Sequence, residues 1–226
     1  MSVSVVIADD QELVRTGFKM ILENTPGIEV LADVGDGDAA LEAVRRLHPD
    51  VLLADIRMPG LDGLELTRLL RDADEGSREG GWQDGGRPQV VIITTFDDDD
   101  YVRTALRNGA SGFLLKDASP ALLVEAVRAA AAGDSLISPA VTVRLLTDMT
   151  EGKNLTRGAR PPREPLTDRE KEVVALTARG RTNAEIAEDL HLSVSSIKAH
   201  LARVQTKLDA RNRVEVALWA WENGLT

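Results

Sequence analysis

The first half of the chain alternates short β-branched runs with helical patterns, and this alternation constrains the fold more than any other feature. The runs fit buried strands over residues 3–8, 29–34, 51–54, 90–94 and 113–115. Apolar residues at helical spacing follow each run, over residues 12–23, 39–47, 64–71, 101–107 and 122–132. Such an alternation favours a parallel sheet with helices on both faces. We therefore predict a five-stranded, doubly wound α/β domain over residues 1–133.

The second half is helical and has its own boundary signals. Residues 167–170 and 182–185 both fit capping boxes, and Gly180 stands where a first helix should end. We predict a small all-α domain of four helices over residues 166–226. Residues 134–165 would be the linker, with a helical start and with Gly and Pro toward its end. Residues 72–88 fit either a tolerated insertion or a partner-docking loop.

Composition removes several classes of protein. The chain has no cysteine, which excludes disulfides, thiolate metal sites and thiol catalysis. It has neither a signal-peptide pattern nor an apolar run of the ~20 residues that span a membrane, so we expect a cytoplasmic protein with no membrane partner. The net charge is −10. Residues 1–150 hold 14 Lys and Arg against 26 Asp and Glu, whereas residues 151–226 hold 13 against 11, which indicates different partners for the two halves.

Charged and polar side chains stand where the predicted strands end. Asp9 and Asp10 follow the first strand, Asp55 the third, Thr94 closes the fourth and Lys116 follows the fifth. The carboxyl ends of parallel strands meet at one edge of a sheet, so these side chains should converge. Three carboxylates repel one another, and their oxygens suit Mg²⁺. With a lysine to balance phosphoryl oxygens, the group predicts transfer of a phosphoryl group to a carboxylate.

These residues, together with residues 55–63, Thr94-Thr95 and residues 109–116, resemble the receiver domain of two-component response regulators. The resemblance implies that Asp55 is the phospho-acceptor. It also implies that Asp10, Asp55 and the backbone carbonyl of Arg57 bind Mg²⁺, with Asp9 acting through water. Lys116 and Thr94 would bind the phosphoryl group, with Thr95 as the second choice for the hydroxyl. Phe113 falls at the family's rotamer-switch aromatic and is otherwise a core residue.

The segment from Ser193 to Leu208 predicts an amphipathic helix with a polar face suited to DNA. Its apolar stripe comprises Ile197, Leu201, Val204 and Leu208. The opposite face carries small and basic residues that can approach phosphates and base edges: Ser195, Ser196, Lys198, Ala199, Ala202, Arg203 and Lys207. A short turn, residues 191–192, joins this helix to the preceding helix over residues 183–190. The pattern predicts a helix-turn-helix, although a solvated basic face would look similar.

Residues 166–173, 183–187 and 193–200 are similar to the LuxR-type helix-turn-helix. Joined to a receiver domain, this motif resembles the NarL/FixJ-type response regulators. By that resemblance Lys198, Ala199 and Ala202 face the bases. The last helix, residues 214–221, would supply a dimer contact, with Trp219 and Trp221 at the interface or in the core.

The resemblance implies a transcription regulator that a sensor histidine kinase phosphorylates at Asp55. Phosphorylation would favour a homodimer that binds double-stranded promoter DNA, and the chain would be no enzyme beyond its own phosphoryl transfer and dephosphorylation. Three alternatives stay open. They are an aspartate-nucleophile phosphatase, a ligand-sensing relative of LuxR and a constitutive regulator whose phosphosite is unused.

Overall fold

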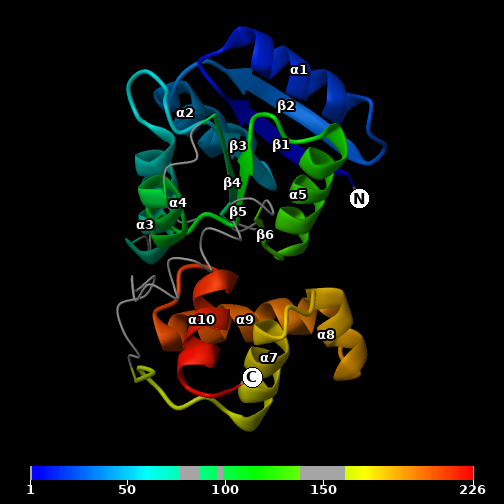
Figure 1. Cartoon of the computed structure of the whole chain (residues 1–226), viewed down its shortest axis with the longest axis vertical. Helices are drawn as coiled ribbons and strands as arrows, with labels where there is room; N and C mark the ends of the chain where they lie inside the picture. Colours follow the sequence, from blue (N-terminus) through cyan, green and yellow to red (C-terminus); the bar gives the residue numbers. More distant parts are fainter. Residues whose placement is uncertain (1, 77–86, 96–98, 138–160, 226) are drawn as a thin grey trace.

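The computed structural model describes residues 2–76, 87–95, 99–137 and 161–225. It contains an α/β part and a helical part, which lie one above the other in Figure 1. Most of the insertion predicted at 72–88 and most of the linker predicted at 134–165 lie outside the described residues. Among the described residues, the helices are all too short or too polar to cross a membrane.

The sheet is parallel throughout, as the alternation of strands and helices predicts. Its strand order is β2-β1-β3-β4-β5-β6. The strands are β1 (Val3–Ala8), β2 (Ile28–Val34), β3 (Val51–Ala54), β4 (Gln89–Thr94), β5 (Gly112–Leu115) and β6 (Leu136–Ile137). The sixth strand is an addition to the prediction, because two residues leave no periodicity to detect. It pairs with β5, and its two residues stand in the segment assigned to the linker.

Helices cover both faces of the sheet (Figure 1). The helices are α1 (Glu12–Glu23), α2 (Gly37–Leu47), α3 (Gly63–Gly76), α4 (Asp99–Asn108) and α5 (Pro120–Ala132). Side chains from α2, α3 and α4 pack in one core with Val6, Leu52 and Ile92. Side chains from α1 and α5 pack in the other core with Val5 and Leu53. Neighbouring strand residues enter opposite cores because side chains alternate across a strand.

Helix α3 is longer than the apolar pattern predicts. The prediction ends it at residue 71, whereas the structure continues it to Gly76. The residues that follow Arg71 include no proline and no glycine before Gly76. Arg68 also contacts Glu65 and Asp72, three and four residues away, which supports a helix in this stretch. The first residues of the predicted insertion are therefore helical.

The helical part contains α7 (Asp168–Ala178), α8 (Asn183–Asp189), α9 (Val194–Leu208) and α10 (Arg213–Glu222). Both predicted capping boxes are present, with Thr167 capping α7 and Thr182 capping α8. His191 adopts a positive φ of 53° between α8 and α9, where the sequence predicts the short turn. The apolar stripe of α9 is buried against α7, α8 and α10. The helix-turn-helix arrangement follows from these contacts.

Candidate phosphorylation site and DNA-binding surface

Three carboxylates meet at the carboxyl edge of the sheet, as the sequence predicts. Asp9, Asp10 and Asp55 each offer an oxygen, and these oxygens lie within 4.8 Å of one another. The backbone amide of Asp55 donates to the carbonyl of Ala8 at 2.8 Å, so the pairing of β1 with β3 positions the two strand ends. Asp9 and Asp55 are buried, whereas Asp10 is exposed. The cluster is thus open to solvent on one side.

Lys116 reaches into this cluster from the end of β5. Its Nζ lies 2.6 Å from Oδ2 of Asp9 and 2.8 Å from Oδ2 of Asp55. Burial raises the pKa of Asp55 above its ordinary value, while the hydrogen bond from Lys116 opposes that rise. One ammonium leaves the three carboxylates undercompensated. The all-oxygen donor set and its exposed member therefore fit a hard divalent cation such as Mg²⁺.

The other predicted receiver residues surround the cluster. Thr94 is fully buried at the end of β4, and its carbonyl accepts from the amide of Lys116 at 2.9 Å. Phe113 is fully buried on β5 and packs in the core beneath α4. Arg57 is exposed in the loop after β3, two residues beyond Asp55. The roles assigned to these side chains remain predictions, since their positions alone do not reveal a switch.

The loop from β3 to α3 needs a glycine beside Asp55. The amide of Gly63 donates to the carbonyl of Ile56 at 2.9 Å, which brings the start of α3 onto the β3 loop. A Cβ atom at Gly63 would collide with the backbone carbonyl of Asp55. Glycine thus permits a close approach that holds the backbone of Asp55 in place.

A contact that the sequence does not predict joins this loop to α4. Nη2 of Arg57 lies 3.3 Å from the hydroxyl of Tyr101, and its Cζ lies 5.9 Å from the centre of the Tyr101 ring. This geometry combines a hydrogen bond with a cation–π interaction. Tyr101 is the single tyrosine of the chain and stands at the start of the helix predicted over residues 101–107. Its position there is the one sequence feature that could have drawn attention to this contact.

Helix α9 presents most of the predicted DNA-facing residues to solvent. Ser195, Lys198, Ala199, Ala202 and Arg203 are exposed, whereas Ser196 is half-buried. The hydroxyl of Ser193, which caps the helix, contacts the hydroxyls of Ser195 and Ser196 at 2.8 Å. These residues form one small, basic surface next to the helix-turn-helix turn.

Lys207 is also half-buried and makes an ion pair inside the helical domain. Its Nζ lies 2.7 Å from Oε2 of Glu170, a carboxylate at 3% side-chain exposure. Burial raises the pKa of Glu170, but the hydrogen bonds from Lys207 and Thr167 together lower it by more. The pKa of Glu170 is therefore below its ordinary value. The ion pair links α9 to α7. A DNA role for Lys207 remains a prediction, whereas its structural role is visible.

A parallel α/β domain with this carboxylate cluster, followed by a helix-turn-helix domain, defines a class of two-domain regulators. The family model of the response regulator receiver domain matches residues 5–128, and that of bacterial regulatory proteins of the luxR family matches residues 164–220. The chain belongs to the response regulators with a LuxR-type DNA-binding domain.

Relatives support this assignment over almost the whole chain. Transcriptional regulatory protein LiaR of Bacillus subtilis (strain 168) is 34% identical over 225 residues, which cover 99% of each protein. Oxygen regulatory protein NreC of Staphylococcus aureus (strain JH9) is 36% identical over 223 residues, covering 98% of each.

Solved structures agree. Response regulator ChrA of a heme-sensing two-component system shows 32% identity and a TM-score of 0.52, over 100% of this chain and 99% of that one. A LuxR-family response regulator from Aurantimonas sp. SI85-9A1 shows 28% identity and a TM-score of 0.58, over 66% of this chain and 99% of that one.

Proposed function

We propose that this chain is a cytoplasmic transcription regulator switched by Mg²⁺-dependent phosphorylation of Asp55, with a sensor histidine kinase as the donor. The observation that carries the proposal is the meeting of Asp9, Asp10 and Asp55 with Lys116 at one sheet edge. A single Asp at a strand end is commonly a cap, but this group combines carboxylates and a cation from separate strands. Relatives that match almost the whole chain and are named as regulatory proteins support the same interpretation.

Each residue has a defined role in the proposed transfer. An oxygen of Asp55 attacks phosphorus, forms a P–O bond and gives an acyl phosphate as the bond to the donor breaks. Asp10, Asp55 and the carbonyl of Arg57 would hold Mg²⁺, and Asp9 would act through water. When bound, the ion neutralises the charge of the phosphoryl oxygens. Lys116 and Thr94 would bind the remaining oxygens, and the chain would catalyse only its own phosphorylation and dephosphorylation.

The helical domain would bind promoter DNA through the exposed face of α9. Ser195, Ser196, Lys198, Ala199, Ala202, Arg203 and Lys207 form the proposed contact set. The modest charge of residues 151–226 favours two copies on the DNA, so phosphorylation would act by promoting a homodimer. Thr94 and Phe113 would transmit the change from Asp55. We divide the chain into a receiver domain (1–133), a linker (134–165) and a DNA-binding domain (166–226).

Intact-mass measurement after addition of Mg²⁺ and a small phosphodonor tests the proposal. We expect one phosphate adduct on the wild type and none on Asp55→Asn. Asp62→Asn is the matched control, because Asp62 is located in the same loop and caps α3, and asparagine also caps. An adduct on Asp55→Asn, or none on the wild type with Mg²⁺ and donor present, would contradict the proposal.

A further inference from the structure

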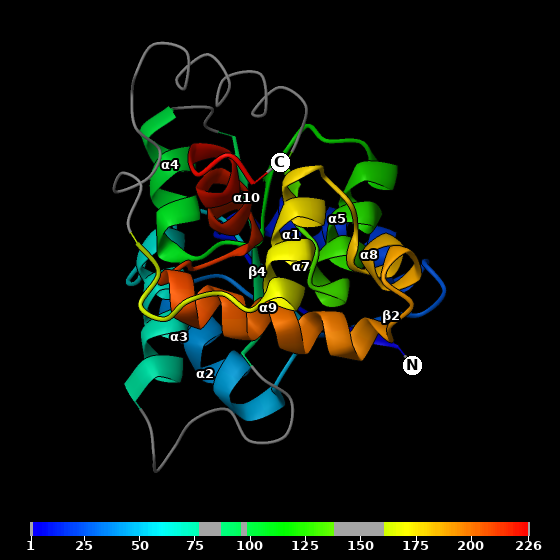
Figure 2. The ribbon, with the colours of Figure 1, turned by 90° about the horizontal axis from the view of Figure 1, so that it is seen from below.

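The two domains meet at the amino edge of the sheet, opposite the carboxylate cluster. Figure 2 shows α10 lying over α4, and α8 and α7 lying over α5. At the end of α5, Nδ2 of Asn183 donates to the carbonyl of Ala132 at 2.9 Å, and Nζ of Lys198 donates to the carbonyl of Ala131 at 3.1 Å. The last turn of α5 therefore contacts one of the proposed base-facing residues of α9, although Lys198 stays exposed.

The carboxylate of Asp134, two residues after the end of α5, completes this contact. Oδ1 of Asp134 accepts from the backbone amide of Asn183 at 2.9 Å and lies 3.2 Å from Nη1 of Arg213. The side chains of Asp134 and Arg213 are 13% and 11% exposed. The same guanidinium donates to Oδ1 of Asn183 at 2.6 Å and to the carbonyl of Arg181. Arg213 thus holds the turn between α7 and α8 and pairs with Asp134 across the domain boundary.

Arg213 depends on a negative partner because it is largely buried. Burial lowers the pKa of Arg213, and the charges of Asp134 and Glu185 oppose this effect. Asn183 and Arg181 supply neutral oxygens that accept hydrogen bonds but carry no charge. Separation of the domains would remove the carboxylate of Asp134 and expose that side of the guanidinium, while Glu185 would stay in the same domain as Arg213. The exposed side of the guanidinium can then pair with another anion.

The same surface contains Lys198. A Cβ at Gly133 would lie 3.2 Å from Nδ2 of Asn183 and 3.6 Å from Cε of Lys198. One short stretch at the end of α5, residues 131–134, therefore contacts the proposed DNA-facing lysine, Asn183 and Arg213 together. Lys198, Asn183 and Arg213 therefore lie on the same surface of the helical domain, which residues 131–134 contact.

We propose that Arg213 and the amide of Asn183 form a binding site for a DNA backbone phosphate, and that Asp134 occupies this site when the domains are packed together. The inference rests on the proposed DNA-binding function and adds to it a phosphate contact and an internal competitor. A phosphate oxygen can accept from the same two donors that Asp134 now uses, and a guanidinium suits phosphate as well as carboxylate. DNA and the end of α5 exclude each other at this site.

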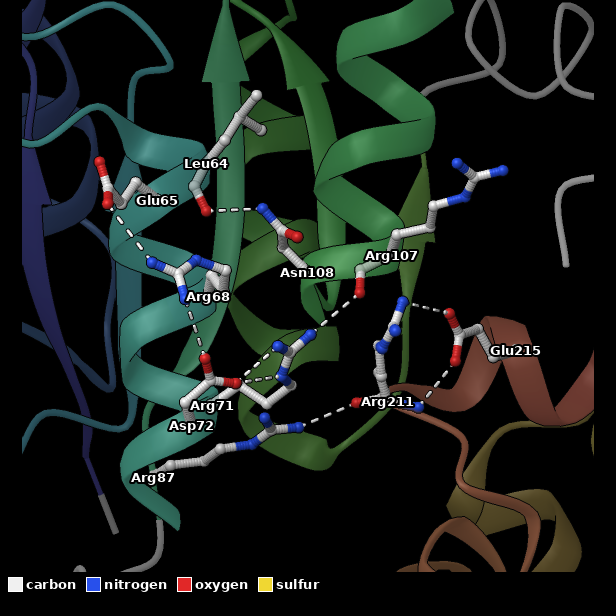
Figure 3. A network of polar contacts seen from close by, with 10 residues as sticks. All are labelled: Leu64, Glu65, Arg68, Arg71, Asp72, Arg87, Arg107, Asn108, Arg211 and Glu215. Carbon is white, nitrogen blue, oxygen red and sulfur yellow. Dashed lines mark hydrogen bonds and ion pairs between the residues drawn. The ribbon is translucent and has the colours of Figure 1, made fainter. Parts of the chain in front are cut away.

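A second interdomain contact has a different chemistry. Nη2 of Arg87 donates to the carbonyl of Arg211 at 3.0 Å, beside the Arg71–Asp72 and Arg211–Glu215 pairs (Figure 3). Nδ2 of Asn212 donates to the carbonyls of Leu106 and Ala110 at 2.7 and 3.1 Å. None of these bonds involves Asp134. A variant at Asp134 therefore tests the phosphate site without removing the whole domain contact.

The first experiment measures the affinity of the unphosphorylated full chain for a short DNA duplex of arbitrary sequence, because phosphate contacts do not depend on sequence. We expect Asp134→Asn to bind at least about fivefold more tightly than the wild type, the lower end of ordinary coupling between sites. Glu125→Gln is the matched control, since it removes one negative charge from an exposed position of α5 where Glu125 pairs with Arg128. Equal affinity of Asp134→Asn and the wild type would overturn the inference.

The second experiment separates a phosphate contact from a simple opening of the domains. In the Asp134→Asn chain, Arg213→Gln should lower the slope of log affinity against log salt by about one, whereas Arg213→Lys should keep that slope. An unchanged slope in Arg213→Gln would overturn the phosphate site. If no variant bound any duplex, even after treatment with phosphodonor, the DNA-binding function itself would fail and the inference with it. DNA binding by the wild type with no gain in Asp134→Asn would overturn the inference alone.

Discussion

The two edges of the parallel sheet differ in how the chain builds them. At the carboxyl edge, Asp9, Asp55 and Lys116 directly follow their strands, so the folding of the sheet brings them together. At the amino edge, the contact joins residues 49 to 124 positions apart, and several acceptors are backbone carbonyls. The carboxyl edge carries chemistry that depends on residue type. The amino edge carries a domain contact that depends on the packing of two separately folded parts.

One strand connects the two edges. The carbonyl of Ala110, just before β5, accepts from Asn212, and Lys116, just after β5, contacts Asp55. A strand is stiff along its axis, so a change at Lys116 can alter the position of the corner that Asn212 binds. Under the proposed function, we expect phosphorylation to act along this strand, weaken the domain contact and shift a pre-existing equilibrium.

The largest expected effect concerns the carboxyl edge. Gly63→Ala should destabilise the receiver domain by about 3 kcal/mol and abolish phosphorylation, because the new Cβ would collide with the carbonyl of Asp55. Thermal unfolding and intact mass would measure the two effects. Gly17→Ala is the matched control, since a Cβ there meets nothing within 4 Å, and alanine favours a helix. Equal stability of Gly63→Ala and the wild type would show that the close approach is unimportant.

A second change tests the helical domain that packs on the amino edge. Lys207→Met should destabilise this domain by about 2 kcal/mol, less than a fully buried pair, because Lys207 is partly exposed. The depressed pKa of Glu170 adds a pH dependence. The contribution of Glu170 to the stability of the folded domain is fully present above the pKa of a glutamate in the unfolded chain. It is lost as the pH falls through the lower pKa of Glu170 in the folded chain.

Unfolding of the full chain between neutral and acid pH would measure this contribution. We expect the wild type to lose more stability than Lys207→Met over that range. A steeper acid loss in Lys207→Met would contradict the assignment of the ion pair.

The third prediction concerns the amino edge itself. Asn212→Asp keeps a good cap for α10 but replaces the Nδ2 donor with a carboxylate that faces the carbonyls of Leu106 and Ala110. The domains should separate more readily, and the affinity of the unphosphorylated chain for DNA should rise about fivefold. Asn223→Asp, an exposed change at the other end of α10, should leave the affinity unaltered. If Asn212→Asp folds normally but binds DNA less tightly, the proposal that DNA binding and the domain contact exclude each other would be contradicted.

The smallest expected effect returns to the carboxyl edge. Tyr101→Phe removes the hydroxyl that lies 3.3 Å from Arg57 and keeps the ring. We expect a loss of about 0.5 kcal/mol in unfolding free energy, since an exposed hydrogen bond contributes little. Tyr101→Leu should cost more, because it also removes the cation–π contact. Equal effects of the two changes would show that the ring contributes nothing.

Sequence patterns predict the elements whose signal is local. Buried apolar runs mark five of the strands, and the residue types at the ends of those runs mark the carboxylate cluster. The two-residue strand β6 and the end of α3 escape prediction, because periodicity needs several residues and charged residues near Gly76 resemble a loop.

Contacts between distant residues leave no such signal. Arg57 and Tyr101 are 44 positions apart, and no pattern links them. Lys207 shares helical spacing with the predicted DNA-facing residues, and only the packing of α7 reveals that Glu170 binds it. Lys198 donates to a backbone carbonyl of Ala131, an acceptor that every residue type provides. The domain contact is therefore visible only in the folded chain.

The central claim is that phosphorylation of Asp55 controls DNA binding. The most direct measurement is the affinity of the full chain for DNA sites selected from random duplexes, before and after treatment with Mg²⁺ and a small phosphodonor. We predict that phosphodonor increases the affinity of the wild type and leaves that of Asp55→Asn unchanged. Equal affinity of the wild type before and after phosphorylation confirmed by mass, or an equal increase in Asp55→Asn, would contradict the account.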